Sequence, residues 1–222
     1  MPNKQSQIII LLGRSGCGKG TQAKLLIKDF GFEYLGTGEI LRKRAKTKDF
    51  SGKKLKREMN QGGRVSTFFV FQIWGNEAEE VKNKPNFKGL VIDGSPRSLL
   101  EAELMDGLFD WYEWKNIKVI LLDISHQEAF ERLAKRRICK QCNRLIPWIG
   151  EFKSLKVCDQ CGGELINRPD DKLEAIRERL NYYKKDVEPA IDYYQKQGRL
   201  IRVNGEKSIE DVYQDVKRAV EN

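Results

Sequence analysis

The fold class follows from residues 8–19, which read Ile8-Ile9-Ile10-Leu11-Leu12-Gly13-Arg14-Ser15-Gly16-Cys17-Gly18-Lys19. The first five are a continuous apolar, β-branched-rich run, as expected for a strand that is buried on both faces. The next seven fit the pattern G-x-x-x-x-G-K, and residues 21–30 continue at helical spacing. In such a loop successive N–H groups and the helix N-terminus face a phosphate, while the lysine supplies a cation to the outer phosphates. Strand, loop, lysine and helix in this order favour a phosphate-binding loop over a chance glycine-rich turn.

The loop departs from the generic motif at one position. Gly20, rather than Ser or Thr, follows Lys19, which removes the hydroxyl that usually lies on magnesium, and Thr21 comes next. Cys17 inside the loop is interpreted as a small filler. The alternative is a redox-sensitive thiol that is activated by the helix end.

Strand patterns and helical patterns alternate along the rest of the chain. Further strands are expected at residues 90–93, 119–123 and 200–203. Helices are expected at residues 40–46, 53–60, 68–82, 99–114, 127–137, 172–195 and 209–220. Ser125 with Glu128 reads as a capping box and Ser208 as a second N-cap. This order predicts an α/β fold with a parallel sheet that is flanked by helices, and residues 47–64 and 138–167 interrupt it as insertions.

The composition excludes several classes of protein. With 222 residues, of which 40% are hydrophobic and 33% charged, the chain is long enough for one packed domain and is neither disordered nor fibrous. No apolar run approaches the roughly 18 residues of a bilayer helix, and the first residues lead into a strand, so we expect a cytoplasmic protein without a membrane partner. A formal net charge of +9 indicates affinity for polyanions or a solvated basic surface.

Four of the five cysteines form two Cys-x-x-Cys pairs. Cys139 and Cys142 are followed by fifteen residues and then by Cys158 and Cys161, which is the spacing of a tetrahedral zinc ribbon. Four cysteine ligands leave no open position for water, so the expected role of the metal is structural. The alternative is a pair of knuckles without metal.

Several segments resemble adenylate kinases and their nucleoside monophosphate kinase relatives. Residues 13–22, GRSGCGKGTQ, look like the phosphate loop of that family, and residues 37–42, TGEILR, look like its acceptor-binding segment. Residues 93–97, DGSPR, resemble its D-G-F-P-R motif, with Ser95 in place of phenylalanine. Residues 132–137 and 168–179 resemble its arginine segments before and after the lid, so the resemblance runs nearly end to end.

The resemblance implies a P-loop NTPase-type fold in three parts. A core is expected from residues 1–35, 66–134 and 172–222, a helical insertion that binds the nucleoside monophosphate from residues 36–65, and a zinc-binding, zinc-ribbon-like lid from residues 135–171. Hinges are expected near Lys135 and Asn167, although relatives often have glycine at the first position. Some adenylate kinases carry such cysteines in the lid over ATP, and zinc would make the lid rigid.

The resemblance also implies roles for individual residues. Phosphoryl transfer between two nucleotides depends on alignment and on neutralising charge, so many cations are expected to converge on the site. The residues implied in catalysis are Lys19, Asp93, Arg97, Arg132, Arg136, Arg168, Asp170 and Arg179. ATP would be bound by Gly13, Ser15, Gly16, Cys17, Gly18, Lys19, Gly20, Thr21 and Arg132. The monophosphate would be bound by Thr37, Arg42, Val65, Gly94, Arg97 and Glu101.

The function that the resemblance implies is reversible transfer of the γ-phosphate of Mg-ATP to AMP, with Mg²⁺ and a structural Zn²⁺. Glu101 stands where adenylate kinases place a glutamine that reads the AMP base, so an alternative is a kinase with relaxed or GMP-leaning acceptor choice. A simpler interpretation of this residue is that Glu101 points to solvent and does not read the base. A rival function is that of a basic P-loop and zinc-ribbon protein that binds nucleic acid and uses ATP as a switch. Because Ser95 replaces the family's phenylalanine, a third alternative is a relative that binds nucleotides without catalysing transfer. We expect a monomer, with no nucleic-acid partner.

Overall fold

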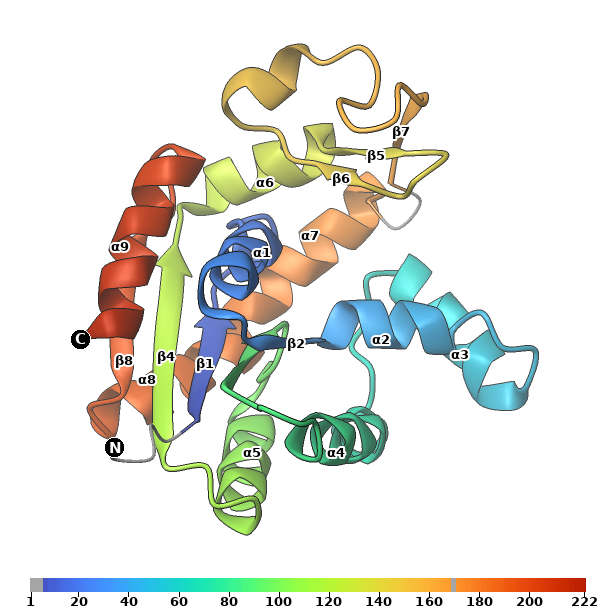
Figure 1. The fold of residues 1–222 in the computed structure, drawn as a ribbon. Helices are drawn as coiled ribbons and strands as arrows, with labels where there is room; N and C mark the ends of the chain where they lie inside the picture. Colours follow the sequence, from blue (N-terminus) through green and yellow to red (C-terminus); the bar gives the residue numbers. More distant parts are fainter. Residues whose placement is uncertain (1–5, 169–170) are drawn as a thin grey trace.

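A parallel sheet forms the centre of the protein (Figure 1). The structure is a computed structural model that describes residues 6–168 and 171–222. Within these ranges the sheet has the strand order β2-β3-β1-β4-β8, with every neighbouring pair parallel. The strands are β1 (Gln7–Leu12), β2 (Glu33–Gly36), β3 (Gly89–Asp93), β4 (Asn116–Asp123) and β8 (Leu200–Asn204). Because all five run in one direction, the loops after them meet at one edge, where ligands bind in sheets of this kind.

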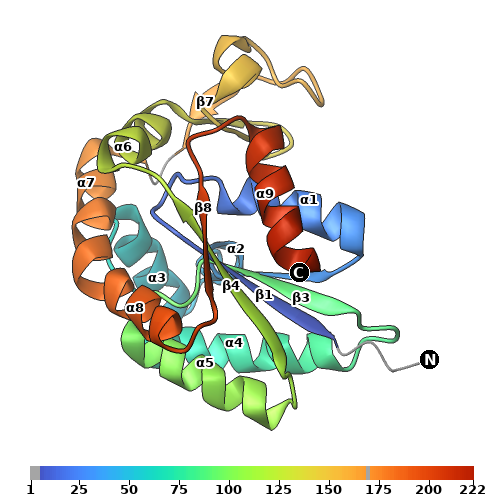
Figure 2. The same cartoon turned by 90° about the vertical axis from the view of Figure 1, so that its left-hand side faces the viewer.

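Helices cover both faces of the sheet (Figure 2). They are α1 (Lys19–Phe30), α2 (Thr37–Arg44), α3 (Phe50–Asn60), α4 (Thr67–Lys82), α5 (Leu99–Trp111), α6 (His126–Lys135), α7 (Leu173–Tyr182), α8 (Glu188–Lys196) and α9 (Ile209–Glu221). Alternate residues of β1 separate the two apolar clusters. Ile8 and Ile10 pack with α4, α5 and α8, whereas Ile9 and Leu11 pack with α1, α6, α7 and α9. The fold class predicted from the sequence is therefore confirmed.

Two segments leave the core. The α2–α3 pair extends sideways from the end of β2 and packs through Leu41 and Leu55 onto Val70 of α4 (Figure 1). The other segment is a small antiparallel sheet of β5 (Arg137–Cys139), β6 (Leu145–Ile146) and β7 (Leu165–Asn167), with a 3₁₀ turn at Gly150–Ser154. Both segments fall where the sequence predicted insertions.

Most predicted elements are found, and two predictions need correction. The helix predicted over residues 172–195 is broken by a π-helical turn, Tyr183–Val187, because Pro189 starts a new helix there. The short strand β2 was not predicted. Both predicted N-cap serines cap their helices, since Ser125 Oγ accepts from Glu128 N at 3.2 Å and Ser208 Oγ from Asp211 N at 3.1 Å. The predicted capping box at Ser125 is only half formed, because its backbone N–H donates to Glu206 Oε1 at 2.8 Å and not to Glu128. In the described part of the chain, no helix has both the length and the apolar composition to cross a membrane.

Candidate functional site

The glycine-rich loop lies between β1 and α1, as predicted. Gly13 has a φ of +137° and passes so close to β4 that a Cβ would lie 2.4 Å from the carbonyl oxygen of Leu122. The Lys19 ammonium donates to the carbonyl oxygens of Gly13 at 2.8 Å and Arg14 at 3.1 Å. The cation is thus held across the loop mouth, and the Cys17 thiol, buried and 3.5 Å from it, fills space beneath.

The structure gives a reason for the glycine after Lys19. A Cβ on Gly20 would lie 3.3 Å from Oδ2 of Asp93, the last residue of β3. Tyr34 donates its hydroxyl to the same oxygen at 3.2 Å, and burial raises the pKa of Tyr34, so the phenol stays a donor. A side chain larger than hydrogen at position 20 would therefore crowd the Asp93 carboxylate, which lies beside the start of α1.

A second basic group lies across the cleft from the loop. Arg97 donates its Nε to the Gly94 carbonyl oxygen at 2.8 Å. Gly94 and Gly38 face each other, and Cβ atoms built on them would lie 3.5 Å from Arg97 Nη2 and 3.2 Å from Arg42 Nη1 respectively. Two guanidinium groups, one from α2 and one from the loop between β3 and α5, therefore converge on this pair of glycines, which is an arrangement suited to a phosphate.

Polar side chains beneath these arginines are buried and paired. Thr37 donates its hydroxyl to Ser95 Oγ at 3.0 Å, so the serine that replaces phenylalanine has a partner on α2. Val65, also predicted for this side, lies half-buried beside the third apolar cluster, in the loop between α3 and α4.

Glu101 lies in the first turn of α5 and is buried, with 2% of its surface exposed. The backbone N–H of Arg97 donates to its Oε2 at 2.6 Å. Burial raises the pKa of the Glu101 carboxyl, and the hydrogen bond from Arg97 opposes that shift only in part. The suggestion that Glu101 points to solvent is therefore wrong.

A buried carboxylate joins the arginines on either side of the lid. Asp171 accepts from Nε and Nη2 of Arg136, the latter at 2.7 Å, and from Nη1 of Arg179 at 2.8 Å. Arg136 follows α6 and Asp171 lies shortly before α7, so this bridge closes the base of the segment that holds the small antiparallel sheet and the four cysteines. Asp171 was not among the predicted site residues.

The other residues predicted for the donor side are Arg132, Arg168 and Asp170. Arg132 is buried and donates to Glu128 Oε1 at 2.6 Å and to the Gly205 carbonyl oxygen at 3.0 Å. Arg168 follows β7 and is half-buried. Asp170, predicted as the second acidic residue, lies outside the described residues.

A cleft joins the phosphate loop to the acceptor side. It is lined by Gly13, Ser15 and Lys19, by residues 94–97, and by Arg179, Tyr182, Tyr183 and Val187. Ser15 and Arg179, both predicted for the site, line the same cleft as Lys19 and Arg97. Gly16, Gly18 and Thr21 belong to the same loop and the first turn of α1.

The sequence did not predict two tyrosines of this cleft, nor the arginine that packs on one of them. The hydroxyl of Tyr182 accepts from Arg97 Nη1 at 3.3 Å, and the ring of Tyr183 lies 4.4 Å from the Arg14 guanidinium. Arg14 is further held by the Ile124 carbonyl oxygen at 2.9 Å. No sequence motif marks the tyrosines, which lie at the end of α7 and the start of the π-helical turn and meet their partners only through the tertiary fold.

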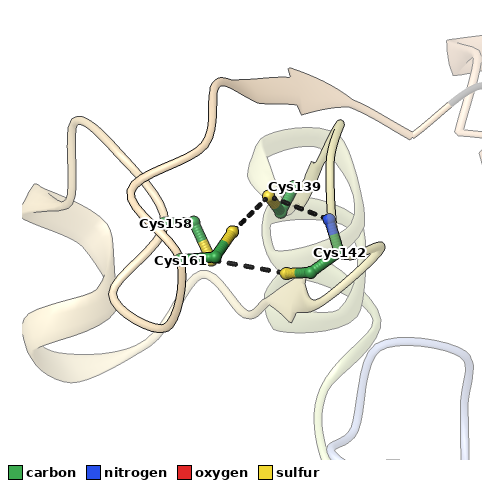
Figure 3. A group of neighbouring side chains, drawn as sticks. All are labelled: Cys139, Cys142, Cys158 and Cys161. Carbon is green, nitrogen blue, oxygen red and sulfur yellow. Dashed lines mark hydrogen bonds between the residues drawn. The ribbon is translucent and has the colours of Figure 1, made fainter.

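The four predicted cysteines converge (Figure 3). Their Sγ atoms all lie within 4.8 Å of one another, with Cys139 and Cys161 at 3.4 Å and Cys142 and Cys158 at 3.7 Å. Tetrahedral zinc with Zn–S bonds of about 2.3 Å places its sulfurs about 3.8 Å apart, so the group fits such an ion. The backbone N–H of Cys142 points to Cys139 Sγ and lowers the pKa of that thiol to about 6, which favours the thiolate that binds metal.

The fold and site define a P-loop kinase with two separate phosphate-binding groups. Residues 11–199 match the family described as adenylate kinase. An adenylate kinase from Caldicellulosiruptor bescii is 37% identical over 215 residues, which cover 96% of this chain and 98% of that protein. One from Archaeoglobus fulgidus is 37% identical over 214 residues, covering 96% and 97%. The chain belongs to the adenylate kinase family, and it is a phosphotransferase of the nucleoside monophosphate kinase type.

Proposed function

We propose that the protein transfers the γ-phosphate of Mg-ATP to AMP, reversibly. The observation that supports this most directly is the placement of Arg42 and Arg97 around Gly38 and Gly94, across one cleft from Lys19. A nucleotide switch needs one phosphate site, whereas a transferase needs two that face each other. The second basic group therefore favours the kinase over the nucleic-acid-binding ATP switch.

On the donor side, residues 13–20 would hold the ATP phosphates. Lys19 would exchange its two loop carbonyl partners for phosphate oxygens, which offer a full negative charge. The Asp93 carboxylate, close to the start of α1, would bind the Mg²⁺ of Mg-ATP through water. When ATP binds, that ion would neutralise part of the phosphate charge.

On the acceptor side, Arg42 and Arg97 would clamp the phosphate of AMP. The Gly94 carbonyl oxygen accepts from Arg97 Nε and so orients that guanidinium, and Thr37, which is bonded to Ser95, would lie beside the same nucleotide. Arg136, Arg168 and Arg179 would add charge from the lid side as the phosphoryl group moves, because its charge spreads over three oxygens in the transition state. Arg132, whose Nη2 has no hydrogen-bond partner among the described residues, would complete the donor side.

The lid and the insertion would act as moving parts around the core. Residues 135–171 would fold over ATP and residues 36–65 over AMP, which would expel water that could otherwise accept the phosphate. Cys139, Cys142, Cys158 and Cys161 would hold a structural Zn²⁺ that makes the lid rigid, since a segment this small buries too little apolar surface to fold alone.

Acceptor choice depends on Glu101 in this proposal. An ionised carboxylate can only accept hydrogen bonds, so it cannot pair with adenine N1, which is also an acceptor. A protonated carboxyl offers one donor and one acceptor, as a glutamine amide does. The burial that raises the pKa of Glu101 favours the protonated form and hence AMP. We expect AMP to be the best acceptor, with weaker discrimination against GMP than a glutamine would give.

The test is a panel of nucleoside monophosphates incubated with Mg-ATP, with the nucleotide products separated. The proposal expects AMP to react fastest. The base-reading role is tested by kcat/KM for AMP and GMP in the native protein and in Glu101→Gln, with Glu103→Gln on the exposed side of α5 as the matched control. Strict AMP selectivity that Glu101→Gln leaves unchanged would exclude the role of Glu101, and a protein that turns over none of the monophosphates would exclude the kinase.

A further inference from the structure

The positive charge of the chain is concentrated in one short segment. Residues 42–58 hold nine of the 41 Lys and Arg residues and two of the 32 Asp and Glu residues, a net charge of +7. The other 205 residues hold 32 basic and 30 acidic residues, a net charge of +2. Seven of the nine surplus charges therefore lie in residues 42–58, which run from the end of α2 through the turn into α3.

Most of this charge is exposed and unpaired. The lysines of the segment are exposed, and no carboxylate of the described residues lies within ion-pair distance of any of them: Lys43, Lys46, Lys48, Lys53, Lys54 and Lys56. Its two acidic side chains are already used, since Asp49 pairs with Arg44 at 2.9 Å and Glu58 with Arg57 at 3.6 Å. Asp49 also caps α3 by accepting from Gly52 N at 2.8 Å. Six point charges therefore face solvent within fourteen residues.

The geometry of α3 gathers part of this charge beside an aromatic ring. Phe50, Lys53, Lys54 and Arg57 follow the spacing i, i+3, i+4, i+7 and so share one face of the helix. Leu55, on the opposite face, is buried against α2 and α4. The Phe50 side chain is 79% exposed. The exposed face of α3, at the far end of the α2–α3 pair in Figure 1, thus combines lysines with an uncovered ring.

The side chains on this face of α3 favour one kind of polyanion over others. Lysines that lack partners bind successive backbone phosphates, and an exposed aromatic side chain stacks on an unpaired base. A membrane surface would need an apolar helix face to insert, but the apolar face of α3 is packed in the protein and Phe50 is its one exposed large apolar residue among those described. The composition thus favours a nucleic acid with accessible bases.

We propose that the face formed by Phe50, Lys53, Lys54 and Arg57, extended by the lysines of the α2–α3 turn, binds single-stranded nucleic acid. This binding is independent of phosphoryl transfer, because Arg42, the residue of this segment that faces the cleft, is not part of it. The interaction is one of phosphate charge and base stacking, with no base-specific contact. It would place a nucleotide-converting enzyme on RNA or DNA through its most basic surface.

The first test is fluorescence anisotropy with labelled uridine RNA and thymidine DNA of about 12 nucleotides, in saturating ADP so that oligonucleotide cannot occupy the nucleotide sites. Affinity should fall as salt rises from about 50 to 200 mM, with a slope of about −0.7 per phosphate contact. The Lys53→Gln/Lys54→Gln variant should make this slope shallower by about 1.4. Lys24→Gln/Lys196→Gln removes the same charge from exposed sites elsewhere and should leave the slope unchanged.

The second test addresses the ring. Phe50→Ser should weaken binding by about tenfold without a change of salt slope, since stacking releases no counterions. Phosphotransfer by these variants should equal that of the native protein. Three results would each overturn the proposal: no salt-dependent binding of either oligonucleotide, equal losses in the control variant, or binding only to vesicles that contain anionic phospholipid. Comparison of the RNA and DNA arms identifies which nucleic acid is preferred.

Discussion

Replacing Asp171 by Asn tests whether the buried bridge at the base of the lid stabilises the protein. The Asp171 side chain is 3% exposed, and its two oxygens accept from Arg136 and Arg179, which are 13% and 12% exposed. Asparagine keeps the size but turns one acceptor into a donor that faces an arginine N–H. It also leaves two guanidinium groups without their shared counter-charge.

The magnitude follows from the burial of the three groups. Breaking a buried ion pair costs about 3 to 5 kcal/mol of the free energy of unfolding, and the slight exposure of both arginines places this pair at about 3 kcal/mol. In a chain of this length each kcal/mol lowers Tm by about 2 to 4 °C, so we expect a decrease of about 6 to 12 °C. Salt should change the difference little, since buried pairs are weakly screened.

Thermal unfolding followed by circular dichroism measures this effect at low and high salt. Asp110→Asn is the matched control, because Asp110 is 78% exposed and pairs with Lys115 at 3.0 Å in solvent. That variant should lose less than about 1 kcal/mol. A Tm of Asp171→Asn no lower than that of Asp110→Asn would refute the reasoning and would mean that the bridge is not formed in solution.

Four further predictions concern the site and the lid. Lys19→Ala should stay folded and lose phosphotransfer by a factor on the order of 100, measured as kcat/KM, because it removes charge compensation in the transition state. The native protein should contain one zinc per chain by metal analysis, and Cys142→Ser should release it and lower Tm while the core stays folded. Tyr182→Phe should raise KM for AMP more than it lowers kcat, since it frees the Arg97 guanidinium, whereas Tyr112→Phe should change neither. Because the folded-state pKa of Glu101 lies above its usual 4.5, stability should fall as pH rises through that range, and thermal unfolding of Glu101→Gln should show a smaller fall.

The sequence predicted β1, β3, β4 and β8 of the parallel sheet and missed β2. β1, β3 and β4 are apolar runs that lie inside the sheet. β2 has four residues, Glu-Tyr-Leu-Gly, and forms the edge of the sheet. Only its pairing with β3 makes it a strand, and periodicity cannot show pairing. For the same reason the π-helical turn was read as a regular helix, although Pro189 was a local sign of the break.

The site residues fall into the same two groups: those that a spacing in the sequence predicts, and those that only the tertiary structure brings together. The glycine-rich loop and the four cysteines could be predicted because each owes its chemistry to a spacing within the chain. Asp171 and Tyr182 could not, because their roles arise from arginines that other elements bring to them. Glu101 was identified by position, but its burial, which decides whether the carboxyl can carry a proton, required the structure.

Through the π-helical turn, one helical segment contacts basic side chains on both sides of the cleft. Tyr182 contacts Arg97 on the acceptor side, the next residue, Tyr183, contacts Arg14 of the phosphate loop, and Asp186 pairs with Arg64 beside the insertion at 2.9 Å. Successive residues of a helix point about 100° apart, so neighbouring tyrosines reach loops on different sides. α7 begins two residues after Asp171, which is bound by Arg136 and Arg179, so the helical segment 173–187 lies next to that bridge and also contacts Arg97 and Arg14. In the proposed mechanism these contacts would couple the parts of the protein that close together for phosphoryl transfer.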